Sequence, residues 1–190
     1  MMAALAALLL WSYQVVLTGS RLDVRATLSP GSDAELRAGD PASVSEVRVN
    51  GARVEPRRGS WRAPSCRKGC RVSYSFDLTH AGASPPQEWL LRPASGEARL
   101  SVHVVATDGQ RFAAAGATAD GALELSSFDL DFAGPAAFGP LQIERIPLGA
   151  RTLQVALAPS GRARPGLLRF IAAQARSVAD YFGQLPVDDP

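Results

Sequence analysis

The stretch Arg71-Val72-Ser73-Tyr74-Ser75-Phe76-Asp77-Leu78 decides the fold that this sequence predicts. Every second residue from Val72 to Leu78 is apolar, and the residues between them are polar. A period of two places all the apolar side chains on one face of a β-strand, whereas a helix would space them by three and four. The stretch therefore predicts a strand with one buried face and one solvated face.

The same alternation recurs on both sides of this strand, with turn signals between the segments. Asn50-Gly51 joins two of the segments, and this pair tolerates the positive φ angles of a tight hairpin turn. The predicted strands are residues 21–28, 46–49, 52–55, 71–78, 97–107, 110–114, 122–125, 141–146 and 152–158. The pattern predicts a mainly β fold, an antiparallel β-sandwich. Its inner faces are expected to include Val24, Leu28, Val49, Val72, Tyr74, Phe76, Val102, Val104, Ile143, Leu153 and Val155.

Near Pro159 the period changes, and a C-terminal α-helix is expected between Pro165 and Phe182. Pro165 suits the first turn of a helix and Gly183 suits the position after its end. The apolar stripe consists of Leu167, Ile171, Ala175, Val178 and Phe182, and it is widened by Leu168, Phe170, Ala172 and Tyr181. This stripe is wider than a single packing contact requires. We therefore expect the helix to pack against two partners, one of them a further domain or chain.

The amino-terminal segment, residues 1–12, begins with an unbroken apolar run. Its length suits the hydrophobic region of an export signal and falls short of the ~20 residues of a membrane span. No lysine or arginine precedes Arg21, so the usual basic region is missing. A buried strand or helix and an uncleaved membrane anchor are the alternatives. We expect export to the periplasm, cell envelope or extracellular space, with a β-sandwich domain at 13–160 and a helix segment at 161–190.

The two cysteines, Cys66 and Cys70, are expected to form a disulfide. Gly69 can relax the short loop between them, and a disulfide agrees with export. Two free thiols and a metal pair are the alternatives. A zinc site needs four ligands, and the only histidines, His80 and His103, stand apart from the cysteines and from each other.

Motifs of catalysis are missing from the sequence: it contains no H-E-x-x-H, G-x-S-x-G, phosphate-binding or dinucleotide-binding pattern. The net charge is +2, with both signs interspersed, so the sequence gives no electrostatic footprint for nucleic acid. We expect no catalytic, cofactor-binding or metal-binding residue in this chain.

Six residues have both a functional and a structural interpretation. Asp129 and Asp131 would share one side of a strand and could bind calcium or transfer protons, but a solvated face opposite Phe128, Leu130 and Phe132 is the simpler interpretation. His103 is expected on a polar strand face and His80 in a loop. Trp61 and Trp89 are expected at core edges rather than as ligand platforms.

Several phrases of this sequence resemble gluzincin metallopeptidases, the aminopeptidase N class and its glycyl-aminopeptidase relatives. Val178-Ala179-Asp180-Tyr181-Phe182-Gly183-Gln184-Leu185-Pro186 is similar to the first helix of their catalytic domain. Three further segments resemble parts of the amino-terminal β domain of the glycyl-aminopeptidase-like branch. They are Trp89-Leu90-Leu91-Arg92-Pro93, Phe138-Gly139-Pro140, and Trp61 to Cys70 followed by Arg71-Val72-Ser73-Tyr74.

The resemblance implies a non-catalytic amino-terminal β domain of a secreted metallopeptidase-like protein, truncated before the zinc-binding motif. It would serve as a scaffold and cleft wall for a zinc catalytic domain packed on the C-terminal helix, and peptide would be the substrate by resemblance only. In such enzymes the two histidines of H-E-x-x-H and a distant glutamate hold the zinc, and none has a counterpart here. A free-standing exported β-sandwich that binds a protein or carbohydrate is the alternative. A small enzyme of another type is disfavoured by the scarcity of histidine and of free cysteine.

Overall fold

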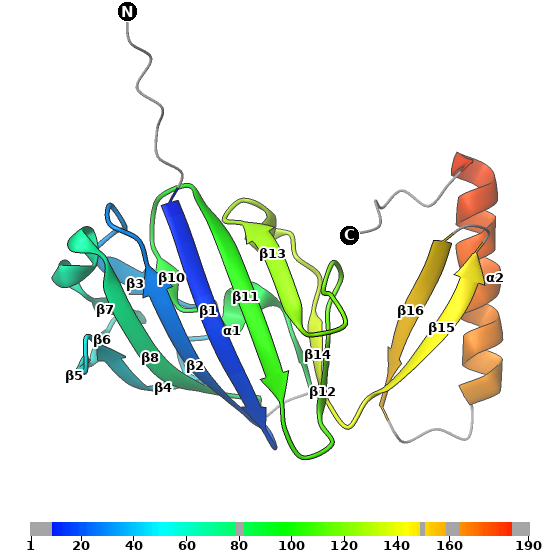
Figure 1. Ribbon diagram of the computed structural model, residues 1–190, viewed down its shortest axis with the longest axis horizontal. Helices are drawn as coiled ribbons and strands as arrows, with labels where there is room; N and C mark the ends of the chain where they lie inside the picture. Colours follow the sequence, from blue (N-terminus) through cyan, green and yellow to red (C-terminus); the bar gives the residue numbers. More distant parts are fainter. Residues whose placement is uncertain (1–8, 79–81, 149–150, 159–163, 184–190) are drawn as a thin grey trace, which may run out of the picture. The chain divides into compact units, whose positions relative to one another are not determined.

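Seven strands form the largest sheet of the computed structural model, in the order β13-β11-β1-β2-β8-β4-β5 (Figure 1). The structure describes residues 9–78, 82–148, 151–158 and 164–183. The strand predicted at residues 71–78 forms as β8, Cys70–Asp77, which pairs with β2 and β4. The other strands are β1 (Leu9–Thr18), β2 (Arg21–Leu28), β4 (Val44–Val49), β5 (Ala52–Arg53), β11 (Ala98–Ala106) and β13 (Ala122–Ser126).

The central strand β1 corrects two expectations. It begins at Leu9, so residues 9–12 of the segment expected to be signal-like belong to the sheet, and Trp11 is only 1% exposed. For these residues the buried-strand alternative holds, while residues 1–8 lie outside the described part of the chain. β1 also runs parallel to β11, from Leu9 opposite Ala98 to Leu17 opposite Ala106, so the largest sheet is mixed rather than wholly antiparallel.

Two smaller sheets share the core with the inner face of the large sheet. One contains β10 (Arg92–Pro93), β3 (Glu35–Arg37), β7 (Ser60–Arg62) and β6 (Pro56–Arg57), and the other contains β12 (Arg111–Ala113), β14 (Ala136–Gly139) and β9 (Ala83–Ser84). Apolar side chains of all three sheets, among them Phe76, Trp61 and Phe138, belong to one buried cluster. The mainly β, layered architecture with a C-terminal helix is therefore confirmed.

The predicted hairpin turn forms at Asn50 and Gly51. Their φ angles are +50° and +85°, and Val49 pairs with Ala52 across the turn. The Asp108-Gly109 pair after β11 also has positive φ at both residues, but the strand that follows it, β12, pairs with β14 instead of returning along β11.

The chain divides into two compact units, residues 1–139 and 140–190. The second unit contains the hairpin of β15 (Gln142–Leu148) and β16 (Arg151–Leu157) and the helix α2 (Arg164–Phe182). Residues 140–158, expected from the sequence to belong to the sandwich domain, therefore group with the helix. Ile143, Leu153 and Val155, expected on an inner face of the sandwich, are half-buried in this second unit, whereas the other eight expected core residues are buried in the first.

A buried segment with its own hydrogen bonds lies beneath the large sheet. The short helix α1, Pro86–Trp89, leads into Leu90 and Leu91, and the last three residues, Trp89 to Leu91, are 0% exposed. The hydroxyl of Tyr74 donates to Trp89 O at 2.8 Å and accepts from Leu91 N at 2.9 Å, and the hydroxyl of Tyr13 donates to Leu91 O at 3.3 Å. Two strands of the sheet thus satisfy backbone groups that burial would otherwise leave unpaired.

Burial raises the pKa of both tyrosines. For Tyr13 the main cause is desolvation, and the nearby Tyr74 adds to it; for Tyr74 desolvation outweighs the opposing hydrogen bond from Leu91 N–H. The folded state therefore favours the neutral phenols more than the unfolded chain does.

Replacing Phe76 with alanine is expected to destabilise the first unit by roughly 3–5 kcal/mol, because the side chain is 3% exposed and its loss leaves a cavity. Phe132→Ala is the matched control: this ring is 76% exposed, and its loss should cost within about 0.5 kcal/mol. Urea unfolding followed by circular dichroism measures both. Equal unfolding midpoints for the two variants would contradict the register assigned to β8.

Alkaline pH is expected to unfold the chain through its buried tyrosines. A phenol whose pKa is higher in the folded state contributes stability that is present below about pH 10, its unfolded pKa, and is lost as pH rises toward the folded pKa. The free energy of unfolding, measured in urea from pH 8 to 11, should fall most steeply above pH 10. The Tyr13→Phe variant, which keeps the Tyr74 hydrogen bonds, should show a shallower fall, and an unchanged slope would speak against this origin.

Candidate functional site

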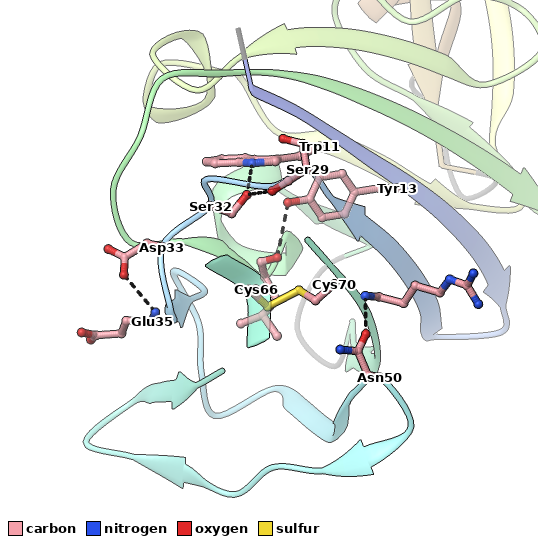
Figure 2. The surroundings of a disulfide bond; sticks show 11 residues. Trp11, Tyr13, Ser29, Ser32, Asp33, Glu35, Asn50, Cys66 and Cys70 are labelled. Atoms are coloured by element: carbon pink, nitrogen blue, oxygen red, sulfur yellow. Dashed lines mark hydrogen bonds between the residues drawn. A yellow bond between two sulfur atoms is a disulfide. The ribbon is translucent and has the colours of Figure 1, made fainter. Parts of the chain in front are cut away.

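A disulfide loop lies at one end of the large sheet (Figure 2). The structure joins Cys66 and Cys70 in a disulfide, as the sequence predicts, and Cys66 is fully buried. The 3₁₀ helix η1, Pro64–Lys68, forms this loop, and Arg67 O accepts a hydrogen bond from Gly31 N at 3.0 Å. Gly69 has φ +86°, and a Cβ there would lie 3.3 Å from Leu28 O and from Pro30 Cδ, so only glycine lets the loop approach β2 this closely.

Hydrogen bonds beside this loop tie the start of β1 to the segment after β2 (Figure 2). Trp11 Nε1 donates to the buried Ser32 Oγ at 3.0 Å, and that hydroxyl donates to Ser29 O at 2.7 Å. Asp33 accepts from the Ser95 hydroxyl at 2.6 Å and from Glu35 N at 3.1 Å. The Ser95 hydrogen bond is the main reason that the pKa of Asp33 lies below its usual range. Each of these polar groups is paired with another part of the chain, so their role here is structural.

His103 and the two cysteines do not form a common site. His103 lies exposed on β11, as expected, and His80 lies outside the described residues. Both cysteines are committed to the disulfide. Within the described ranges no group of three or more His, Cys, Asp or Glu side chains is placed to hold a metal ion. The residues described here therefore do not fit the zinc site of the resembled family.

The carboxylates Asp129 and Asp131 lie on a 3₁₀ helix, η2 (Asp129–Asp131), and not on a strand as expected. The Asp129 carboxylate accepts two hydrogen bonds from Ser126, one from the hydroxyl at 2.6 Å and one from the backbone N–H at 3.2 Å. These bonds stabilise a turn. Asp131 forms an ion pair with Arg92 at 2.8 Å. Each carboxylate thus has a separate structural partner, and the two do not form a shared site.

The tryptophans considered as ligand platforms are core residues. Trp61 is 1% exposed and Trp89 is fully buried, with its indole Nε1 donating to Ser84 O at 3.3 Å and its ring edge-on to Phe138. This agrees with the structural interpretation of both residues.

An exposed aromatic pair was not expected from the sequence. Leu130 is buried, but Phe128 and Phe132 are 73% and 76% exposed, and their ring centroids lie 5.2 Å apart. Phe132 also borders a pocket of about 300 Å³ whose other walls are mostly small and apolar, from Pro86, Ala114, Ala115, Leu123, Leu125, Asp129, Ala133 and Gly134. The change from strand to 3₁₀ helix turns these rings outward, which an alternating pattern does not reveal.

The helix α2 contacts β15 with a face of small and branched side chains. The half-buried residues on it are Leu168, Ile171, Ala172, Ala175 and Ala179, which recur by three and four. Only Ile171 and Ala175 of the expected stripe belong to this face. Leu168 and Ala172 were expected to widen the stripe, and Ala179 was not part of the prediction, so the half-buried face is rotated toward these three residues.

Five other large apolar side chains of α2 are exposed. Leu167, Phe170, Val178, Tyr181 and Phe182 have exposed fractions of 45%, 63%, 38%, 83% and 61%. We call these five residues the outer helix face. The rings of Tyr181 and Phe182 meet edge-on at 4.8 Å. Single exposed apolar residues are ordinary, whereas these five share one sector of the helix surface. All five belong to the apolar stripe, or to its widening, that the sequence predicts, so the expected apolar surface beyond one contact is present on the helix.

None of the described helices is both long enough and apolar enough to cross a membrane. The disulfide is compatible with export, which stays a prediction.

Comparisons with known proteins find similarity in structure only. No protein-family model matches the chain, and no curated protein sequence matches it significantly. An aminopeptidase N family protein from Idiomarina loihiensis matches with a TM-score of 0.71 and 13% identity over 94% of this chain and 38% of that chain. Native leukotriene A4 hydrolase from Saccharomyces cerevisiae gives 0.47 and 13% identity over 78% of this chain and 31% of that chain. The yeast hydrolase in complex with bestatin gives 0.42, with the same identity and coverage.

The first of these structures carries the conclusion. This chain spans a little over a third of that protein's length, and at 13% identity the likeness is one of fold. The chain has the fold of the amino-terminal domain of aminopeptidase N-like proteins, as the resemblance in its sequence implied.

Proposed function

We propose that this chain is the non-catalytic amino-terminal β domain of a secreted metallopeptidase-like protein, in which it acts as a scaffold and cleft wall for a zinc catalytic domain. The observation that carries the proposal is the outer helix face. Its five apolar side chains are exposed, although they lie next to the side of the helix that is half-buried beside its own hairpin. A partner domain that covered these residues would account for so much exposed apolar surface outside the second unit's own contacts.

The fold supports the same role. The matched Idiomarina protein is described as a member of the aminopeptidase N family, and most of its length lies outside the region that this chain resembles. In this proposal the catalytic zinc and its ligands belong to that other part, and the present chain supplies surface and support only. Peptide as the substrate of the whole assembly is part of the proposal.

The proposal is tested by finding and binding the partner. The transcript beyond the codon for Pro190, and the adjacent reading frames, are expected to encode H-E-x-x-H. That segment, expressed separately, should bind this chain in isothermal titration calorimetry. Phe170→Ser/Tyr181→Ser should weaken binding by tenfold or more, about 1.4 kcal/mol, because two exposed rings are lost from the contact.

The matched control is Arg169→Ser/Arg176→Ser, which also introduces two serines into the helix, but on an exposed, polar side. It should bind like the unsubstituted chain. The chain alone should neither retain stoichiometric zinc nor cleave aminoacyl substrates. Chelator-sensitive peptidase activity of the pure chain, or equal weakening by both double variants, would refute the proposed role.

Hydrogen exchange gives an independent prediction about the helix. No residue of α2 whose side chain is described is buried, whereas β8 is buried along its inner face. We expect amides of residues 172–182 to exchange faster than those of 71–78, because a helix packed on one side opens locally. Mass spectrometry of the monomer measures both. Equal protection would mean that the helix needs no further partner.

A further inference from the structure

A groove of about 730 Å³ with mixed polar and apolar walls lies at one end of the large sheet, beside the disulfide loop. Its walls are residues 27–30 at the end of β2, the Asn50-Gly51 turn, and residues 69–71 at the start of β8. The volume is in the range of small-molecule sites. The proposed function makes no use of this groove.

Four of the nine residues that line the groove carry polar side chains: Thr27, Ser29, Asn50 and Arg71. Thr27 and Arg71 are cross-strand neighbours with exposed side chains, so a hydroxyl and a guanidinium group stand side by side. Asn50 Oδ1 accepts from Arg71 N at 2.9 Å, which leaves the amide NH₂ as the donor that Asn50 can offer a ligand. Arg48 Nη1 donates to Gly51 O at 3.3 Å, and this bond brings a second guanidinium group to the rim.

The charge at the groove is positive and is not neutralised locally. No carboxylate lines the groove. In the part of the chain that the structure describes, Arg48, Arg71 and the neighbouring Lys68 form no ion pair. A carboxylate ligand is therefore favoured, since a guanidinium fork binds the two oxygens of a carboxylate together.

The walls of the groove are held in place before any ligand binds. The disulfide and Gly69 fix one wall against β2, and the positive φ angles of Asn50 and Gly51 fix the turn on the other side. A preformed site loses little conformational entropy on binding.

The topology distinguishes between kinds of ligand. β2 and β8 are internal strands, paired on both sides, so the groove offers no free sheet edge to which an extended peptide could add as a strand. Recognition must come from side-chain hydroxyl, amide and guanidinium groups, which suit a ligand rich in hydroxyls. We propose that this groove binds an acidic saccharide of the uronic acid class, with its carboxylate on Arg71 and its hydroxyls on Thr27 and Asn50.

Titration of the full chain with trigalacturonic acid tests the proposal by calorimetry. We expect saturable binding that weakens as sodium chloride is raised, because the contact is between exposed charges. The fully methyl-esterified trisaccharide, equal in shape but uncharged, should bind at least tenfold more weakly. Lys68 is the chain's single lysine and precedes a groove residue, so saturation with the acid should also slow its acylation relative to the terminal amine.

Two variants locate the site. Arg71→Gln should weaken binding by tenfold or more, and its fold should survive because Asn50 bonds the backbone of residue 71 and not its side chain. Arg111→Gln removes the same exposed charge from β12, in a different sheet, and should leave the affinity unchanged. Circular dichroism checks the fold of both.

Three outcomes would overturn the proposal. The first is no saturable binding of trigalacturonic acid. The second is equal weakening by Arg71→Gln and Arg111→Gln, which would indicate attraction to net charge. The third is a hexa-aspartate peptide that binds as tightly and competes, which would make the groove a general polyanion site. None of these outcomes depends on the role proposed for the helix.

Discussion

The fold depends on a peptide segment that crosses beneath the large sheet without belonging to it. Residues 89–91 are fully buried, and their backbone groups find partners in the hydroxyls of Tyr13 and Tyr74. A buried peptide group without a partner is costly, so these two hydroxyls are what make an irregular backbone tolerable inside an apolar core. They also connect β1 and β8, strands on either side of β2, to the lower layer. The layered arrangement follows from this connection as much as from apolar contact.

Alternation made the strands with one solvated face predictable. β2, β8 and β11 carry polar residues at outward positions, and their limits agree with the sequence to within a residue or two. β1 could not be read in the same way, because Leu10 and Val16 are apolar on its outward face, 52% and 40% exposed. An apolar run without alternation is equally typical of an export signal. Its parallel pairing with β11 depends on a partner far along the chain, which no local pattern encodes.

The candidate surfaces were predictable only in part. The cysteine pair and the Asn-Gly turn follow from spacing and residue type, and both form. Phe128, Leu130 and Phe132 alternate like a strand, but Ser126 and Asp129 bond each other locally and produce a 3₁₀ helix, so the two rings turn outward. The helix limits were predicted well and its half-buried face only in part, because the side that meets the hairpin depends on the tertiary fold. The groove could not be predicted from the sequence, because its walls come from residues 27–30, 50–51 and 69–71, which only the tertiary fold brings together.

The parallel pairing of β1 with β11 has a consequence for how the chain folds. Leu9 lies opposite Ala98, 89 positions later, so the centre of the sheet closes only when residues far apart in the sequence have met. Closing so long a loop is entropically unfavourable, and topologies dominated by such contacts fold slowly. During synthesis β1 can pair with β2 at once, but its other edge stays open until the ribosome has released β11. For that interval the newly made chain presents an unpaired apolar strand edge, the kind of surface that chaperones recognise and that aggregates when left uncovered.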